Sequence, residues 1–289
     1  MQVKAIVSSA GLGATDNDDC AGFAETPAGL CAWVIDGATN VAGADFLNAG
    51  RGDVAWYANA LSERLAAIAA HGLALADQHA AAADDVAALH RDLVVRLAAP
   101  PPLYAHPLAA LTMVRLLDGR AELYHLGDCP AFALDDDGGV RRLTVWEPSD
   151  AADESRSVVM ATQAAVGFAP KAVIADRLPS LRRRREEQLS TRPLDVSAPI
   201  AGVAFGGYAA SFELAGVAAI VLMSDGFERF AVKYALGDEA AMVRRAVAEG
   251  PAPVLAALRA VEEADPDCRR FPRLKPSDDA TCLVLRVGG

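Results

Sequence analysis

Apolar runs with the spacing of β-strands alternate along this chain with longer segments that have the spacing of α-helices. Near the N-terminus the pattern predicts strands over residues 3–8, 21–25 and 30–35, with a glycine-containing turn at 11–13. Segment 30–35 is apolar at every position, which indicates a strand that is buried on both faces.

The pattern changes to a helical one between residues 45 and 99. Apolar residues recur there at steps of three and four, which predicts a helix that begins near Asp53 and a second helix over residues 84–97. The positions that carry the first of these periods are Val54, Tyr57, Leu61, Leu65 and Ile68. Three consecutive prolines at 100–102 end the second helix.

A strand-like pattern returns at Ala109 and predicts three neighbouring strands of an antiparallel meander, with hairpin turns at 118–119 and 137–139. Residues 146–210 are irregular and predict a partly helical excursion over the sheet. Regular elements resume with a strand at 217–223, helices near 238–248 and 253–265, and a strand at 281–287. No repeat or low-complexity linker divides the chain, so we predict one domain over residues 1–289 with a layered α+β fold.

The net charge of the chain excludes some classes of binding partner. Lys and Arg number 27 against 38 Asp and Glu, a formal net charge of −11. An acidic surface disfavours nucleic acids and anionic membranes. The longest apolar run is too short to span a bilayer, and the N-terminus lacks the apolar region of a signal peptide. We therefore expect a cytoplasmic protein with no nucleic-acid or membrane partner, and the alanine bias is typical of a GC-rich bacterial genome. The oligomeric state stays open.

Several common types of reactive site are not indicated. The five cysteines form no C-x-x-C pair, so neither a zinc knuckle nor a disulfide framework is predicted. No serine lies in a nucleophile elbow, and the five histidines include no H-x-x-x-H pair. The glycine pairs lack the lysine or following helix of a phosphate-binding loop.

Four short acidic motifs lie beside apolar, strand-like runs. They are residues 16–19, Asp36-Gly37, Asp225-Gly226 and Asp278-Asp279. Carboxylates that converged from several strand ends would repel one another unless a cation lay between them. Mg²⁺ and Mn²⁺ prefer such oxygen ligands, and Asp36 is the natural carboxylate to bridge two ions. An Asp-Gly pair after a strand is usually only a turn, so an acidic globular protein without a metal site is the alternative.

The order of the acidic motifs resembles that in the metal-dependent protein phosphatases of type 2C. The motifs that carry the resemblance are Asn17-Asp18-Asp19, Val34-Ile35-Asp36-Gly37, Leu126-Gly127-Asp128, Met223-Ser224-Asp225-Gly226 and Asp278-Asp279-Ala280-Thr281. The resemblance spans about residues 3–287. It implies a four-layer α-β-β-α sandwich of two antiparallel sheets flanked by helices.

The same resemblance implies roles for individual residues. Asp18 would bind one ion in place of the family's glutamate, supported by Asp19, and the Gly37 carbonyl would bind an ion that Asp36 also holds. Asp225 and Asp278 would complete the site of the second ion, and Asp128 would help to hold a third, weaker one. The implied catalytic residues are Asp36, Asp18 and Asp225, and the ions are Mn²⁺ or Mg²⁺. A hydroxide that bridges them would attack phosphoserine or phosphothreonine in a phosphoprotein directly.

The chain departs from the family where substrate is handled. Ala14 stands where the family usually has a phosphate-binding arginine, Ala38 where it often has a histidine, and Cys129-Pro130 replaces Ser-Arg. Phosphate would then be bound by Lys275 and Arg273, just before Asp278. Other candidates are the arginines at 182–185 and Arg192, although the run at 182–185 can equally be a solvated helix face.

Two functional hypotheses follow from these departures. The first is a metal-dependent phosphatase with altered substrate handling, in which Lys275→Ala raises KM for a phosphomonoester at unchanged metal affinity. The second is a catalytically silent module of the same fold that binds a phosphoprotein or regulatory partner.

Overall fold

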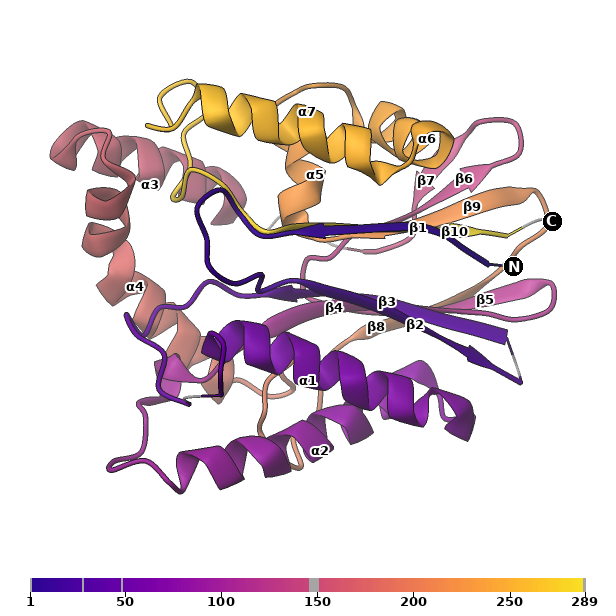
Figure 1. The fold of residues 1–289 in the computed structure, drawn as a ribbon, viewed down its shortest axis with the longest axis horizontal. Helices are drawn as coiled ribbons and strands as arrows, with labels where there is room; N and C mark the ends of the chain where they lie inside the picture. The colour runs from indigo at the N-terminus through magenta and orange to yellow at the C-terminus, as the bar shows by residue number, and fades with distance from the viewer. Residues whose placement is uncertain (1, 28, 48, 146–150, 288–289) are drawn as a thin grey trace.

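Two antiparallel β-sheets pack face to face, and helices cover the outer face of each (Figure 1). The computed structural model describes residues 2–27, 29–47, 49–145 and 151–287. One sheet has the strand order β1-β10-β9-β6-β7 and the other β2-β3-β4-β5-β8. This arrangement confirms the four-layer sandwich that the motif order implied.

Most of the strands lie in segments whose apolar residues alternate or run continuously. They are β1 (Gln2–Ser9), β2 (Cys20–Thr26), β3 (Gly29–Gly37), β4 (Ala109–Leu116), β5 (Arg120–Leu126), β6 (Ala131–Asp135), β7 (Val140–Arg142), β8 (Tyr208–Glu213), β9 (Val217–Met223) and β10 (Ala280–Arg286).

Most helices follow segments with an apolar period near 3.6 residues, and one of them begins directly after strand β9. They are α1 (Asp53–Ile68), α2 (Leu75–Val94), α3 (Ala151–Val166), α4 (Pro170–Ser190), α5 (Asp225–Val232), α6 (Glu239–Glu249) and α7 (Pro251–Ala264), with short 3₁₀ helices η1 (Ala69–His71) and η2 (Leu103–Ala105). No helix in the described ranges has both the length and the apolar character that crossing a bilayer requires.

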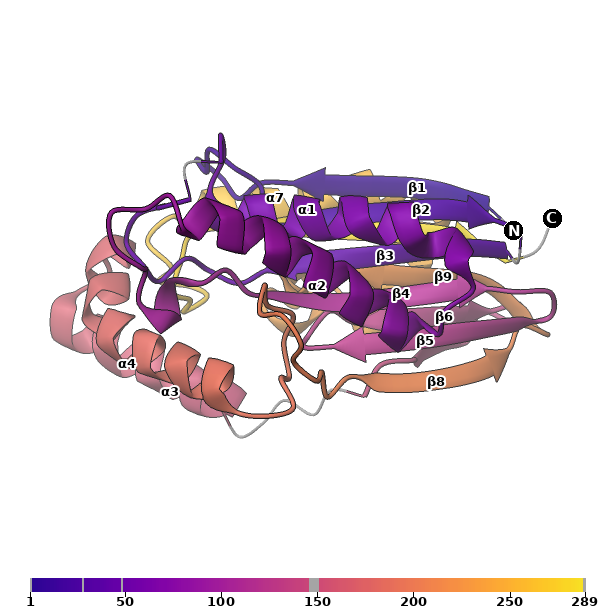
Figure 2. The same ribbon diagram turned by 90° about the horizontal axis from the view of Figure 1, so that it is seen from below.

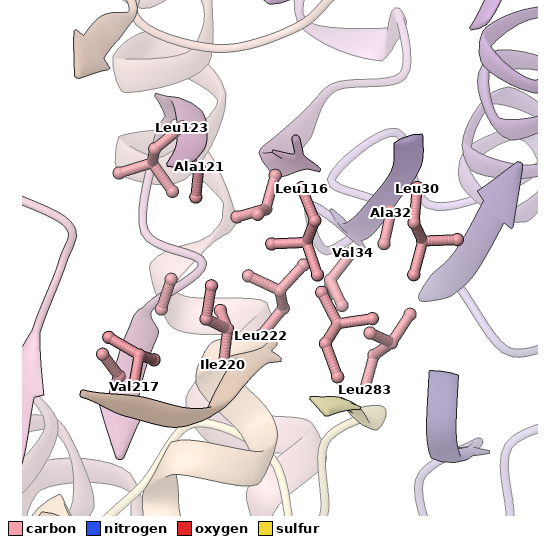
Figure 3. Close-up of a cluster of buried hydrophobic side chains, with 14 of the residues drawn as sticks. Leu30, Ala32, Val34, Leu116, Ala121, Leu123, Val217, Ile220, Leu222 and Leu283 are labelled. Carbon is pink, nitrogen blue, oxygen red and sulfur yellow. The ribbon is translucent and has the colours of Figure 1, made fainter. Parts of the chain in front are cut away.

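Strand β3 is buried on both faces, as its continuous apolar pattern predicted. Leu30, Ala32 and Val34 point into the core between the two sheets (Figure 3). Trp33 and Ile35 point the other way, into the core beneath α1 and α2. Side chains alternate between the faces of a strand, so a strand can contribute to two cores only if it is apolar at every position. The end of β3, where Asp36 lies, is therefore held in place by packing on both faces of the strand.

The position of β6 corrects the sequence prediction. β4 and β5 form the expected hairpin, but β6 lies in the other sheet, between β7 and β9. The chain leaves β5 through Gly127, which has φ +89 and lies against Ala110. The apolar pattern of β6 fits an antiparallel strand in either sheet. The pattern therefore could not reveal that the chain passes from one sheet to the other between β5 and β6.

Three further elements differ from the predictions. α2 begins at Leu75 rather than near residue 84, because its first turns bury Gln78, His79 and Ala82 instead of large apolar side chains. Neither the edge strand β8 nor α5 was predicted. β8 has mostly exposed or half-buried side chains, and α5 has only 8 residues.

Helices α3 and α4 lie across one end of the sandwich, beyond the strand ends, in both views (Figures 1 and 2). The predicted excursion over residues 146–210 is thus partly helical: α3 and α4 are followed by an irregular segment over 191–207 and by the start of β8, and residues 146–150 lie outside the described part. The two helices cover the ends of the sheets rather than the face of either. Leu189, near the end of α4, packs with Leu108 and Leu194 and holds the helix to the frame.

Candidate metal centre

Five aspartates from five strand ends meet beneath α3 and α4. Asp36 lies at the end of β3, and the charges that act most strongly on it come from Asp19, Asp225, Asp128 and Asp278. These precede β2, begin α5 after β9, follow β5 and precede β10, respectively. The backbone N–H of Asp225 donates a hydrogen bond to Asp36 Oδ2 over 3.1 Å. The fold therefore assembles acidic motifs that are far apart in the sequence.

Two glycines allow the acidic turns to approach so closely. A Cβ on Gly37 would lie 2.4 Å from the carbonyl oxygen of Asp18, and one on Gly226 would lie 1.8 Å from that of Asp279. Both distances are well inside van der Waals contact, so only glycine fits at these positions. The Asp-Gly pairs thus have a steric reason here beyond turn formation.

The carboxyl groups are held where negative charge is unfavourable. Burial raises the pKa of Asp36 well above its usual range, and the neighbouring carboxylates raise it further. Burial raises the pKa of Asp19 to about 8, against the effect of a hydrogen bond from Ser224. Burial, together with the charge of Asp225, raises the pKa of Asp128 to about 7. Such a cluster favours protons or metal cations at its centre.

Asp19 has a buried carboxylate oxygen that suits a cation. The residue is 4% exposed. Its Oδ2 atom is buried without a hydrogen-bond partner among the described residues. A buried carboxylate oxygen without a partner is costly, and a cation would remove that cost.

Asp18 has different surroundings from the other acidic residues. Burial raises its pKa to about 7, with a further contribution from Asp279, while the ammonium of Lys275 opposes the shift. The groups that most affect Asp36 do not include it. Its backbone carbonyl, rather than its carboxyl group, is what lies against Gly37.

Asp278 is already paired with two cations. Its carboxylate forms ion pairs with Arg229 of α5 and with Lys275. Burial opposes its negative charge, but these cations outweigh burial and lower the pKa of Asp278 below its usual value. Lys275 also donates to Thr39 Oγ1 over 3.2 Å. Across the described ranges, no three Asp, Glu, His or Cys side chains are arranged as a ready set of metal ligands.

Two residues that sequence reasoning missed hold the acidic turns in place. Asp279 accepts hydrogen bonds from the backbone N–H groups of Gly11 and Asp18, both at 2.7 Å. Arg259 of α7 donates to the carbonyls of Asp278, at 2.7 Å, and Ser9, at 3.1 Å. Asp279 could have been identified as the acid beside Asp278, whereas nothing in the sequence around Arg259 indicates this contact.

The two residues predicted to bind phosphate have different environments. Arg273 is 3% exposed and pairs with Asp265 at 2.6 Å, and it also donates to the carbonyl of Pro276. Its guanidinium is thus engaged within its own loop. Lys275 reaches the acidic cluster itself. Among the described residues, Arg192 donates to the carbonyls of Leu189 and Thr191 at the end of α4.

A hollow of about 460 Å³ opens above the acidic cluster. Asp36, Asp128, Asp225 and Asp278 line it from the sheets, and Arg184 and Arg185 line it from α4. Ala38 lines it too, whereas Ala14 is an exposed residue of the turn after β1. The hollow therefore brings carboxylates and guanidinium groups to opposite sides of one space.

The donor set fits a hard divalent cation. Every candidate ligand is a carboxylate or carbonyl oxygen, which suits Mg²⁺ or Mn²⁺ and not a metal that prefers thiolate or imidazole. The raised pKa values of Asp19, Asp36 and Asp128 and the unpartnered Asp19 oxygen point to the same chemistry.

Comparison with known proteins agrees with the family resemblance of the acidic motifs. The family profile described as protein phosphatase 2C matches residues 10–260. The *Mycobacterium tuberculosis* serine/threonine phosphatase PstP/Ppp has a similar fold, with a TM-score of 0.56, 17% identity and coverage of 99% of this chain and 98% of that one. No match was found among the curated proteins.

Two further solved structures share the fold. The *Staphylococcus aureus* serine/threonine phosphatase Stp1 has a TM-score of 0.57 and 11% identity, covering 100% of this chain and 96% of that one. The catalytic domain of PstP in complex with two manganese ions has a TM-score of 0.54 and 16% identity, covering 99% and 97%. At these identities the likeness concerns the fold.

Proposed function

The chain belongs to the protein phosphatase 2C family, and on that premise we propose that it is a metal-dependent phosphatase that hydrolyses phosphoserine or phosphothreonine in phosphoprotein substrates. The observation that carries the proposal is the meeting of Asp19, Asp36, Asp128, Asp225 and Asp278 at the ends of different elements. An ordinary turn aspartate would not lie half-buried among four other acids.

In this proposal two ions, Mn²⁺ or Mg²⁺, bind at the acidic cluster. Asp36 would hold both ions, Asp225 and Asp278 would hold one of them, and Asp18 and the Gly37 carbonyl would hold the other. Asp19 supports Asp18, and Asp128 helps to hold a third, weaker ion. When bound, such ions lower the pKa of a coordinated water and neutralise charge on a phosphoryl group.

The chain's own groups orient the reactants. The Asp225 backbone N–H donates a hydrogen bond to Asp36 and orients its carboxylate. The ammonium of Lys275, which pairs with Asp278, can change partner and pair with a substrate phosphate. Water attacks phosphorus without a covalent enzyme intermediate. Burial, together with the charge of Asp36, raises the pKa of Cys129 well above its usual value, so this neighbouring thiol stays protonated and is a poor nucleophile.

One observation favours the second candidate function, a silent module that binds a phosphoprotein without hydrolysing it. Arg229 and Lys275 already neutralise Asp278, a carboxylate that the phosphatase needs for an ion. Ala14 and Ala38, in place of groups that handle substrate, agree with that possibility.

Turnover of p-nitrophenyl phosphate and of phosphoserine and phosphothreonine peptides tests the proposal, in EDTA, Mg²⁺ or Mn²⁺. We expect activity that needs the ion and falls about 10³-fold in Asp36→Asn, because several kcal/mol of charge stabilisation depend on the ions. Asp137→Asn, in the exposed β6–β7 turn, is the matched control and should retain activity. Calorimetric metal binding without turnover would support the silent module, and no metal binding would refute both.

A further inference from the structure

The cations that line the hollow differ in whether they are already paired. They are Arg184, Arg185, Arg229, Lys233, Arg273 and Lys275. Arg229 and Lys275 pair with Asp278, and Arg273 pairs with Asp265. Lys233 also has an interaction partner. The two arginines of α4 form no ion pair within the described part of the chain, so they are the cations that remain for a further anion.

α4 is attached to the loop that follows Asp36. Arg182 Nε donates to the carbonyl of Val41 over 2.8 Å, and its terminal nitrogen donates to that of Ala42 over 3.0 Å. Its guanidinium also lies 4.9 Å from the centre of the Tyr104 ring. One turn further along the helix, Arg185 donates to the carbonyl of Thr39 over 3.2 Å. These contacts place the side of α4 with Arg185 over the acidic cluster.

Arg185 is held as a cation with few partners. Its hydrogen bond to Thr39 is the one that its guanidinium makes to the described residues. Burial lowers its pKa to about 10, which leaves it protonated at neutral pH. A partly buried guanidinium without a counter-ion is unfavourable, and its planar array of N–H donors matches phosphate oxygens.

We propose that Arg185, with Arg184 beside it, binds the phosphate of the substrate and supplies from α4 the cation that the chain lacks at Ala14. This inference rests on the proposed phosphatase function and identifies its substrate-binding site. The ligand is a phosphomonoester dianion. Ile174, Leu181 and Val196 line the same hollow, so the organic group that carries the phosphate meets an apolar wall.

Binding of inorganic phosphate to the Mg²⁺-loaded full chain, measured by calorimetry, tests the site independently of turnover. Arg185→Ala should weaken phosphate binding about 10- to 100-fold, the usual range for a hydrogen bond to a charged group. The double substitution of Arg184 and Arg185 by alanine should weaken it further. Arg183→Ala is the matched control, because this exposed arginine on the same helix does not line the hollow.

Two more measurements separate binding from a purely structural role. For p-nitrophenyl phosphate, Arg185→Ala should raise KM by a similar factor and change kcat less, while Mg²⁺ affinity stays that of the wild type. Arg185→Lys keeps the charge and should recover part of the phosphate affinity. A loss in Arg185→Ala that Arg185→Lys does not recover at all would assign Arg185 to the attachment of α4 and overturn the inference.

The remaining outcomes distinguish this inference from the proposed function. Wild-type protein that binds phosphate, loses it on Arg185→Ala and shows no turnover would uphold the phosphate site and refute the phosphatase. Equal phosphate affinity in the wild type and the double variant would overturn the site, whatever the turnover. Wild-type protein that binds no phosphate would also overturn it.

Discussion

Two regions of the molecule hold their functional groups in different ways. We call the two sheets, with the helices α1, α2 and α5–α7 on their outer faces, the frame, and the helices α3 and α4 the cover. In the frame, β3 is buried at every residue from Leu30 to Ile35, and its register with β4 pairs Asp36 with Ala110. In the cover, α4 runs for 21 residues and buries only Val173 and Leu189. The carboxylates of the frame are thus fixed by two cores and a ladder of hydrogen bonds, whereas the arginines of the cover depend on a few surface contacts.

The two regions also differ in charge in a way that suits a phosphatase. The frame presents carboxylates, which suit metal ions, and the cover presents guanidinium groups, which suit phosphate. A cover with few buried residues can change its sequence at little cost to the fold. In the function that we propose, such a cover supplies the arginine that the chain lacks at Ala14.

The largest effect on global stability that we expect concerns the acidic frame without metal. The folded protein raises the pKa of Asp36, of Asp19 to about 8 and of Asp128 to about 7, whereas an unfolded aspartate has a pKa of about 3.9. The native state then holds more protons than the unfolded state. These groups therefore contribute their whole stabilisation of the folded state below about pH 4, where they are protonated in both states. The contribution is lost as the pH rises towards 8 and the folded protein has to release the protons.

Urea unfolding in EDTA between pH 7 and 8 measures this loss. Burial lowers the pKa of His79, His90, His106 and His125, so these residues are neutral in the folded protein. An unfolded histidine has a pKa of about 6.5 and is mostly neutral above pH 7, so the histidines oppose the trend only weakly in this window. We expect the free energy of unfolding to fall by about 2 kcal/mol, and Mn²⁺ to reverse the fall. Asp36→Asn should reduce the slope. A free energy that rises over this range would contradict the repulsion inferred for the cluster.

Native-state hydrogen exchange should show the same contrast as a difference in local stability. The cover has few buried side chains, so its amides can exchange through local opening, whereas those of β3 need a larger unfolding event. We expect protection factors in α4 to be about 10²-fold lower than in β3. α1, a helix of the frame with seven buried residues, is the control and should exchange more slowly than α4. Equal protection in α4 and β3 would remove the distinction between the regions.

The contrast also explains what the sequence could predict. Asp36 follows a continuously apolar strand, and Asp225 follows another, so local patterns located both, and the motif order implied that they meet. Arg185 lies in a run of arginines at 182–185, and the contacts of Arg182 and Arg185 with the loop after Asp36 decide which side of the helix faces the hollow. One of the two partners of Asp278 was equally hidden, because Arg229 belongs to a helix that the pattern did not predict.

Lys275 lines the hollow between the two regions, and its replacement should have a moderate effect. The sequence alone suggested that Lys275→Ala raises KM at unchanged metal affinity. The ion pair with Asp278 changes the second part, because the ammonium competes with a metal ion for that carboxylate. We expect KM for p-nitrophenyl phosphate to rise about 10-fold, as for a lost charged hydrogen bond, and Mn²⁺ to bind several-fold more tightly.

Steady-state kinetics and calorimetry with Mn²⁺ measure both changes. Lys171→Ala, an exposed lysine in the first turn of α4, is the control and should alter neither constant. Unchanged KM would remove Lys275 from the phosphate site. Weaker Mn²⁺ binding would show that the ammonium supports the metal site instead of competing with it.

The smallest effect should come from loosening the cover without removing a phosphate-binding group. Arg182→Ala deletes two hydrogen bonds to the loop after Asp36 and the contact with Tyr104, but leaves Arg184 and Arg185 in place. Each lost hydrogen bond is worth about 1 kcal/mol at most in such a half-exposed site, and part of that is recovered from water. We expect KM to rise about threefold, faster amide exchange in α4, and unchanged exchange in β3. Arg183→Ala should leave all three as in the wild type. If Arg182→Ala accelerates exchange in β3 as well, the cover supports the frame, and the two regions are one cooperative unit.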